Sequence, residues 1–187
     1  MRKVVVSEYV TLDGVMEDPD GAEGFKHGGW SFQFWNEEAA KFKFDELFAS
    51  DALLLGRVTY QGFSAAWPTM QGTGEYGERM NSLPKYVVST TLSEVTWNAS
   101  LIKDHIVEEV SRLKQESGQD LLVFGSGELV HLLHQHDLID EYRLMVHPVV
   151  LGSGKRLFRD GTDKKVLRLI DTRTFSSGIV VLSYQPA

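Results

Sequence analysis

The amino-acid sequence predicts an α/β protein with a mainly parallel central sheet, helices on both faces and an antiparallel hairpin at the C-terminal end. Three observations lead to this fold class. Short runs of β-branched and other apolar residues recur along the 187 residues, as expected of buried strands. Segments with helical spacing separate the earlier runs, and this alternation is typical of parallel strands. The last two runs follow each other across Ser176, Ser177 and Gly178, a pattern typical of a hairpin.

The N-terminal part of the chain is expected to alternate strands and helices. Asn36 is a good N-cap residue, and Glu37 and Glu38 follow it in the first turn, where the helix dipole favours acidic side chains. The expected buried positions of this helix are Phe42, Leu47 and Phe48. The expected segments are strand Lys3–Ser7, turn Thr11–Gly14, loop Glu17–Gly29, a helix over 37–49, strand Ala52–Leu55, short helix Thr59–Phe63, loop Ala65–Gly77 and strand Tyr86–Val88.

The C-terminal part contains the most informative stretch, LLVFGSGELVHLL at residues 121–133. Leu121–Phe124 is expected to be a strand buried on both faces, and the following turn of Gly125, Ser126 and Gly127 leads into a short helix. The other expected segments are a helix capped by Asp104 with Ile106, Val110 and Leu113 at helical spacing, strand Tyr142–Val146, loop Gly152–Lys155, and the paired strands Val166–Phe175 and Ile179–Tyr184.

Composition limits the protein class. A chain of 187 residues that is 42% apolar suits one domain, spanning residues 1–187. A net charge of −7 argues against a nucleic-acid partner and against an anionic membrane surface. Without cysteine there is no disulfide and no cysteine-ligated zinc. No apolar run is long enough for a signal peptide or a membrane span, so we expect a soluble cytoplasmic protein.

The glycine turn at residues 125–127 is a candidate phosphate site. A strand that feeds a helix through such a turn leaves backbone N–H groups free at the positive end of the helix dipole. The alternative is an ordinary strand–helix connection. The turn is not a Rossmann fingerprint, because Val130 stands where the third glycine belongs. The loop ending at Gly154-Lys155 is not a P-loop either, because Arg156 follows the lysine.

Two further strand ends carry residues suited to phosphate. Gly56 and Arg57 follow a buried strand, where an arginine can hold a phosphate through two hydrogen bonds and Thr59 can add a hydroxyl. Ser89 and Thr90 end the next strand. The alternatives are a surface arginine with a capping threonine, and an ordinary polar turn.

Two other chemistries receive less support. His131, His134 and His136 lie close together in sequence, but the neighbouring carboxylates do not have clear ligand spacing, so no metal site is predicted. A hydrolase that uses Ser126 would need a histidine within hydrogen-bond distance, and the turn lacks the spacing of a nucleophile elbow.

Taken in chain order, the three strand-end sites resemble the dihydrofolate reductase fold. The stretches LLLGRVTYQGF, LPKYVVSTTL and HPVVLGSGKRLF, with TLDG at residues 11–14, are similar to stand-alone members of the RibD C-terminal reductase family of riboflavin biosynthesis. The resemblance covers nearly the whole chain and rests on the order and spacing of these motifs.

This resemblance implies an NADPH-dependent reductase acting on a small heterocyclic or carbonyl substrate. Residues implied to hold the cofactor are Gly56, Arg57, Thr59, Ser89 and Thr90 on the 2′-phosphate side and Gly125, Ser126, Gly127, Glu128 and Leu129 at the pyrophosphate. The nicotinamide is expected near Leu12–Gly14, and the aromatic residues Trp30 and Trp35 are expected to wall the substrate. The family also implies a homodimer, formed through the C-terminal strands.

The catalytic acid is where the chain departs from these families. Dihydrofolate reductase carries an acid on its first helix, at a place that falls near Ala40 here. Glu38 is a candidate substitute, and the alternative is a surface acid that complements the helix dipole. Asp13 is a candidate for a polar or acid–base contact with substrate, and its alternative is a turn-forming Asp-Gly pair. A non-catalytic NADP-binding or small-molecule-binding dimer is the second hypothesis for function.

Overall fold

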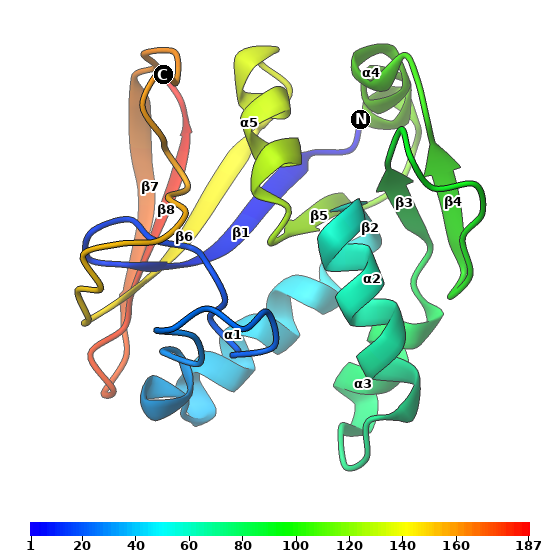
Figure 1. Ribbon diagram of the computed structural model, residues 1–187. Helices are drawn as coiled ribbons and strands as arrows, with labels where there is room; N and C mark the ends of the chain where they lie inside the picture. The colour runs from blue at the N-terminus through cyan, green and yellow to red at the C-terminus, as the bar shows by residue number, and fades with distance from the viewer.

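The protein folds around one eight-stranded sheet, as a computed structural model describing residues 1–187 shows (Figure 1). The strands are β1 Val4–Thr11, β2 Ser50–Gly56, β3 Lys85–Val88, β4 Ala99–Ile102, β5 Asp120–Phe124, β6 Glu141–His147, β7 Leu167–Thr174 and β8 Val180–Pro186. The helices are α1 Glu37–Phe48, α2 Arg57–Ala66, α3 Gly74–Ser82, α4 Ile106–Gln115 and α5 Gly127–Gln135, with 3-10 turns η1 Phe32–Phe34 and η2 Trp67–Thr69.

The strand order is β4-β3-β2-β5-β1-β6-β8-β7. The first six strands in this order are parallel to their neighbours, while β8 is antiparallel to both β6 and β7. A mainly parallel sheet with an antiparallel C-terminal hairpin is the predicted fold class, which the structure confirms. The carboxyl ends of six parallel strands therefore share one edge of the sheet, where α/β proteins bind their ligands.

Helices cover both faces of the sheet because alternate strand residues point in opposite directions. On one face, Val4 and Val6 of β1 pack with Leu113 of α4 and Leu133 of α5. On the other face, Val5 packs in the cluster that contains Leu47 of α1, Tyr60 of α2 and Met80 of α3. Figure 1 shows α1 and α5 on opposite sides of β1. The predicted placement of helices on both faces is confirmed.

Helix α1 begins as predicted and differs at its end. The Asn36 side chain accepts a hydrogen bond from the Ala39 N–H at 3.0 Å, so it is the N-cap. Phe42 and Leu47 are buried, but the prediction for Phe48 was wrong, since 38% of it is exposed. Phe48 is the last residue of α1, stacks on Phe44 and lies next to Arg79 of α3.

Two elements were absent from the sequence prediction. The expected loop over 65–77 contains the end of α2 and the start of α3, a helix that buries only Gly77 and Met80. Strand β4 lies at the sheet edge and has only one buried residue, Ile102. With so few buried positions, neither segment has a detectable apolar period. Asp104 is not the cap of α4, because His105 occupies that position in a left-handed conformation without a side-chain cap bond.

Strand β1 is longer than predicted and continues from Val4 to Thr11.

No helix has the length and apolar character needed to cross a membrane.

Candidate active site

Neighbouring strands bring the predicted phosphate-binding residues to one edge of the sheet. Strands β3, β2 and β5 are adjacent and end at Val88, Gly56 and Phe124, so Ser89 and Gly125 directly follow β3 and β5. Three sites that are far apart in sequence therefore lie in a row, with the Gly56 site between the Ser89 and Gly125 sites. Strand β1, which leads to Asp13, is the next in the row.

The glycine turn is locked to the end of β2. The Ser126 N–H donates to Thr59 Oγ1 at 2.9 Å, and the Ser126 hydroxyl accepts from the Gly56 N–H at 2.9 Å. Gly125 has a φ of +53°, and a Cβ at this position would lie 2.7 Å from Thr59 Oγ1. Glycine is therefore required at 125, both for its backbone conformation and for its lack of a side chain. The role found for Thr59 is to hold this turn.

Helix α5 presents an uncapped N-terminus to this edge. Ser126 is the N-cap residue, but its side chain makes no cap hydrogen bond, because its hydroxyl bonds to Gly56 and to the Phe124 carbonyl. The first N–H groups of a helix have no partner within the helix. A Cβ on Gly127 would lie 3.1 Å from Met16 Sδ, so the space above the turn is narrow. The first turn thus offers backbone donors to an anion that fits a narrow space.

The other predicted cofactor residues divide into free and engaged side chains. Arg57 is exposed, and its guanidinium bonds only to Gln61, in the next turn of α2. Thr90 is exposed, whereas the Ser89 hydroxyl accepts hydrogen bonds from the Thr91 and Leu92 N–H groups and so holds its own turn.

Two residues of the α5 first turn contribute their backbone only. The Glu128 carboxylate points to Arg159, which donates to it at 2.7 and 3.1 Å. The Leu129 side chain is buried in the core. Their N–H groups lie in the first turn of α5, and their predicted role at the pyrophosphate stays a prediction.

Strands β1 and β5 part at the carboxyl end of the sheet. Their pairing ends at Ser7 and Phe124, while β1 continues beside β6 as far as Thr11 and His147. The gap therefore opens beside the glycine turn. Glu8, the first residue of β1 beyond this pairing, is 4% exposed, and its Oε1 makes no hydrogen bond.

Helix α1 places a charged cluster against β1 beneath this gap. Lys43 and Glu46 are buried and paired, and the Ser7 hydroxyl donates to Glu46 Oε1 at 2.8 Å. The Lys43 ammonium lies 4.0 Å from the centroid of the Phe124 ring. Arg143 of β6 approaches the second Glu46 oxygen at 3.6 Å. Sequence reasoning missed this cluster, although Lys43 and Glu46 share the helical period of buried Ala39, Phe42 and Leu47.

An aromatic group lies at the ends of β1 and β6. The His147 ring contacts Tyr9, Trp30 and Phe34 edge-on, with centroids 5.4, 5.0 and 5.9 Å away. Burial lowers the pKa of His147, so the ring is neutral near pH 7. Trp30 is buried and donates from Nε1 to the Glu17 carbonyl. Trp35 is 47% exposed and takes no part in this group, so only Trp30 among the two predicted tryptophans belongs to it.

Asp13 fastens two loops together. It accepts a hydrogen bond from the Thr11 hydroxyl at 2.6 Å and from the N–H groups of Leu151 and Gly152. These hydrogen bonds, the Thr11 hydroxyl first, lower the pKa of Asp13 to about 2. An acid held ionised in this way cannot donate a proton near neutral pH. Asp13 is therefore an anionic anchor between two loops, and its predicted polar or acid–base contact with substrate stays a prediction.

Glu38 also has a different role from the predicted one. It is exposed and accepts hydrogen bonds from the Ser176 hydroxyl at 2.5 Å and the Ser176 N–H at 3.1 Å. The hydroxyl and then the N–H of Ser176 lower the pKa of Glu38. Glu38 thus ties α1 to the turn between β7 and β8, and its predicted catalytic role stays a prediction.

The metal and hydrolase alternatives find no support in the side-chain contacts. His134 is buried, and its two ring nitrogens lie 2.7 Å from the Tyr142 hydroxyl and 3.1 Å from the Asp163 carbonyl. No group of three or more His, Cys, Asp or Glu side chains is placed to hold a metal ion. The Ser126 hydroxyl bonds to backbone groups and to no histidine, so the condition set for a hydrolase is not met.

Comparison with known proteins identifies the family. Residues 2–181 match the model of the RibD C-terminal domain. The chain belongs to the RibD C-terminal domain family. It is 34% identical to the uncharacterized protein YyaP of Bacillus subtilis (strain 168) over 186 residues. This alignment covers 98% of this chain and 94% of YyaP.

Solved structures extend the likeness in fold. A candidate riboflavin biosynthesis protein from Shewanella sp. PV-4 superposes with a TM-score of 0.78 at 22% identity, covering 99% of both chains. Dihydrofolate reductase from Enterococcus faecalis, solved with NADP(H), gives a TM-score of 0.65 at 13% identity, covering 98% of this chain and 96% of the enzyme. The fold is therefore that of dihydrofolate reductase and RibD-like proteins, and family and fold together point to a reductase-type function.

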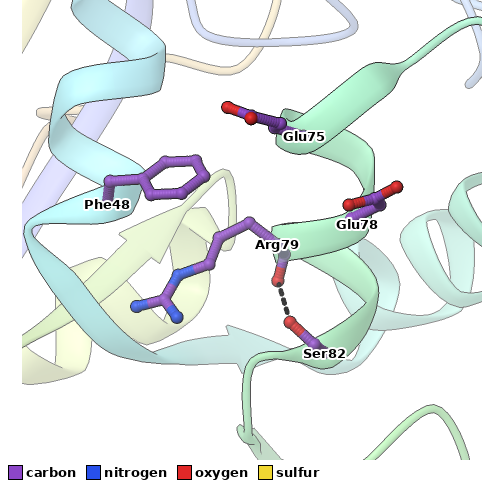
Figure 2. A pocket seen from close by; sticks show the side chains of 5 residues that line it. All are labelled: Phe48, Glu75, Glu78, Arg79 and Ser82. Carbon is purple, nitrogen blue, oxygen red and sulfur yellow. Dashed lines mark hydrogen bonds between the residues drawn. The ribbon is translucent and has the colours of Figure 1, made fainter.

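A surface hollow of about 500 Å³ lies away from this edge, between α1 and α3. Figure 2 shows the Arg79 side chain extending below Phe48, with Glu75 and Glu78 on the same helix pointing away from the guanidinium. The Arg79 guanidinium lies 5.5 Å from the Phe48 ring and donates to the Ser50 carbonyl at 2.7 Å. The one cation of the hollow is therefore engaged in tying α3 to α1 and β2, and the hollow is separate from the candidate active site.

Proposed function

We propose that this member of the RibD C-terminal family is an NADPH-dependent reductase of a small heterocyclic or carbonyl substrate, of the pterin-like or riboflavin-precursor-like class. The observation that carries the proposal is the continuous row of strand ends from β3 through β2 to β5, which combines an arginine, hydroxyls and an uncapped helix N-terminus. A dinucleotide phosphate needs this combination of donors along its length.

The residues present fit the cofactor. The narrow turn at Gly125 and Gly127 would receive the pyrophosphate on the α5 N–H groups, and the exposed Arg57 and Thr90 would receive the 2′-phosphate. The gap between β1 and β5 would receive the nicotinamide end. When bound, NADPH supplies the hydride, and the protein supplies orientation and a site from which water is excluded.

The substrate would lie beyond the gap, over the ends of β1 and β6. The aromatic group around His147 and the loop held by Asp13 form this part of the edge. Flat aromatic walls suit a flat heterocycle or a conjugated carbonyl compound.

Titration of the protein with NADPH and with NADH tests the cofactor. Arg57→Ala is expected to weaken NADPH binding about 10- to 100-fold, the value of a lost charge-assisted contact, and to leave NADH binding nearly unchanged. Arg112→Ala is the matched control, because the Arg112 side chain is exposed on the surface of α4 and pairs only with Glu109 and Glu116. Equal affinity for both nucleotides, unchanged in Arg57→Ala, would contradict the assignment.

An NADPH-oxidation screen across pterins and pyrimidines then separates the enzyme from the second hypothesis. Tight NADPH binding with no oxidation by any compound of these classes would favour a non-catalytic NADP-binding protein.

We also propose that the protein forms a homodimer through its C-terminal strands. Strand β7 pairs only with β8, and seven of its eight residues are exposed. A long exposed edge strand is a ready site for pairing with another chain.

A further inference from the structure

Glu8 is an acid in the interior of a core strand. It follows Val4 and Val6 on the same side of β1, and both of these are completely buried. Glu8 itself is 4% exposed, and its Oε1 has no hydrogen-bond partner. A buried carboxyl oxygen without a partner is costly, so it needs a physical explanation.

The position of Glu8 relates it to the proposed cofactor. The strand order β3-β2-β5-β1 puts the 2′-phosphate residues first, the pyrophosphate turn next and β1 last. The part of the cofactor that follows the pyrophosphate would therefore reach β1 where it separates from β5. Glu8 is the first residue beyond that separation, and its carboxyl is close enough to the glycine turn for the Gly125 N–H to lower its pKa.

The groups around Glu8 do not compensate a full negative charge. Burial raises its pKa well above the ordinary value, and the Lys43 ammonium and the Gly125 N–H oppose this only in part. Lys43 is already paired with Glu46, whose own charge raises the pKa of Glu8 further. Tyr9, the next residue of β1, is the other titratable neighbour, and its pKa is raised by burial. The surroundings of Glu8 therefore favour its protonated form more than water does, and a nearby positive charge would favour the ionised form.

We propose that Glu8 is the proton-holding residue of the proposed nicotinamide site: a carboxyl group that keeps its proton beside the neutral reduced nicotinamide and releases it beside the cationic oxidised ring. The inference rests on the proposed NADP-dependent function. It assigns a titratable group to the site after Asp13 and Glu38 were found to be fixed as ionised acceptors elsewhere.

Calorimetric binding of NADP⁺ and of NADPH, each in buffers of different ionisation enthalpy, measures proton release directly. The wild-type protein is expected to release up to one proton more for NADP⁺ than for NADPH. The ratio of NADP⁺ to NADPH affinity should rise with pH, by up to tenfold per pH unit, across the interval in which Glu8 titrates. The 2′-phosphate titrates in both nucleotides, so its contribution to proton release is the same for both and cancels in this comparison.

Glu8→Gln removes the proton while keeping the shape, so the extra proton release should vanish and the affinity ratio should become independent of pH. Glu108→Gln, at an exposed position on α4, should behave as wild type. Equal proton release for both nucleotides in the wild type, which requires no variant to fold, would overturn the role of Glu8 and leave the cofactor assignment intact. Failure of both nucleotides to bind would overturn the proposed function, and this inference with it.

Discussion

At the scale of single residues, a charged side chain can hold separate loops in place. The Asp13 carboxylate joins the loop after β1 to the loop after β6 through the N–H groups of Leu151 and Gly152. Arg156, in the loop after β6, adds a further hydrogen bond between the two loops by donating to the Asp13 carbonyl at 3.0 Å. The loops at the proposed substrate end are therefore held together by an ionised aspartate.

The pH dependence of stability tests this role of Asp13. The pKa of Asp13 falls on folding from about 3.8 to about 2, so its contribution is complete above pH 4 and is lost as the pH falls toward 2. Asp13→Asn should reduce the free energy of unfolding by about 1 kcal/mol at pH 7, or about 2–4 °C in Tm. The difference from wild type should shrink when thermal unfolding is measured at pH 3.

Asp104→Asn is the control for this measurement, because Asp104 is exposed and does not cap α4. A difference between wild type and Asp13→Asn that stays constant from pH 7 to pH 3 would contradict the anchoring role.

The sequence predicted residue positions at the site better than it predicted what the side chains do. The turn at Gly125 and the exposed position of Arg57 could be predicted because glycine turns and strand-end arginines follow from local sequence. The contacts of Asp13 and Glu38 depend on residues about 138 positions away, which no local pattern contains. Glu8 was detectable in principle, as an acid at the period of buried Val4, Val6 and Val10.

At the scale of elements, α5 combines a structural task with a binding task. Leu129, Val130 and Leu133 bury one side of this helix in the core, while its uncapped first turn faces the proposed cofactor. The extent of burial also explains which elements could be predicted from the sequence. Strands β2 and β5 are buried along their length and were evident in the sequence, whereas α3 and β4 bury too little to produce a pattern.

Replacing Gly127 separates the two tasks of α5. Gly127 is helical, so alanine suits its backbone, and the added Cβ meets only the flexible end of Met16 at 3.1 and 3.5 Å. Gly127→Ala should leave Tm unchanged within about 2 °C, while the methyl group narrows the phosphate space and weakens NADPH binding by about tenfold or more.

Gly62→Ala is the matched control, since Gly62 lies inside α2 and a Cβ there would meet no atom within 4 Å. If Gly127→Ala bound NADPH as tightly as Gly62→Ala does, the pyrophosphate would not lie at this turn.

At the scale of the whole molecule, the two outermost strands of the sheet differ in length. Strand β4 ends one edge with four residues, whereas β7 ends the other with eight. Leu169 and Ile170 of β7 are 50% and 42% exposed, and charged Arg168, Asp171 and Arg173 surround them. An edge that is long, partly apolar and carries both signs of charge is complementary to a second copy of itself about a twofold axis.

Light scattering after size-exclusion chromatography tests this pairing. The wild type is expected to elute as a dimer, and Ile170→Lys should shift it to a monomer, because a lysine at a strand–strand contact brings two ammonium groups together across the twofold axis. Met70→Lys, at an exposed apolar position after η2, should remain dimeric. The Ile170→Lys monomer should keep its NADPH affinity, because the row of strand ends lies within one chain. A wild-type monomer at micromolar concentration, or an Ile170→Lys dimer, would exclude β7 as the interface.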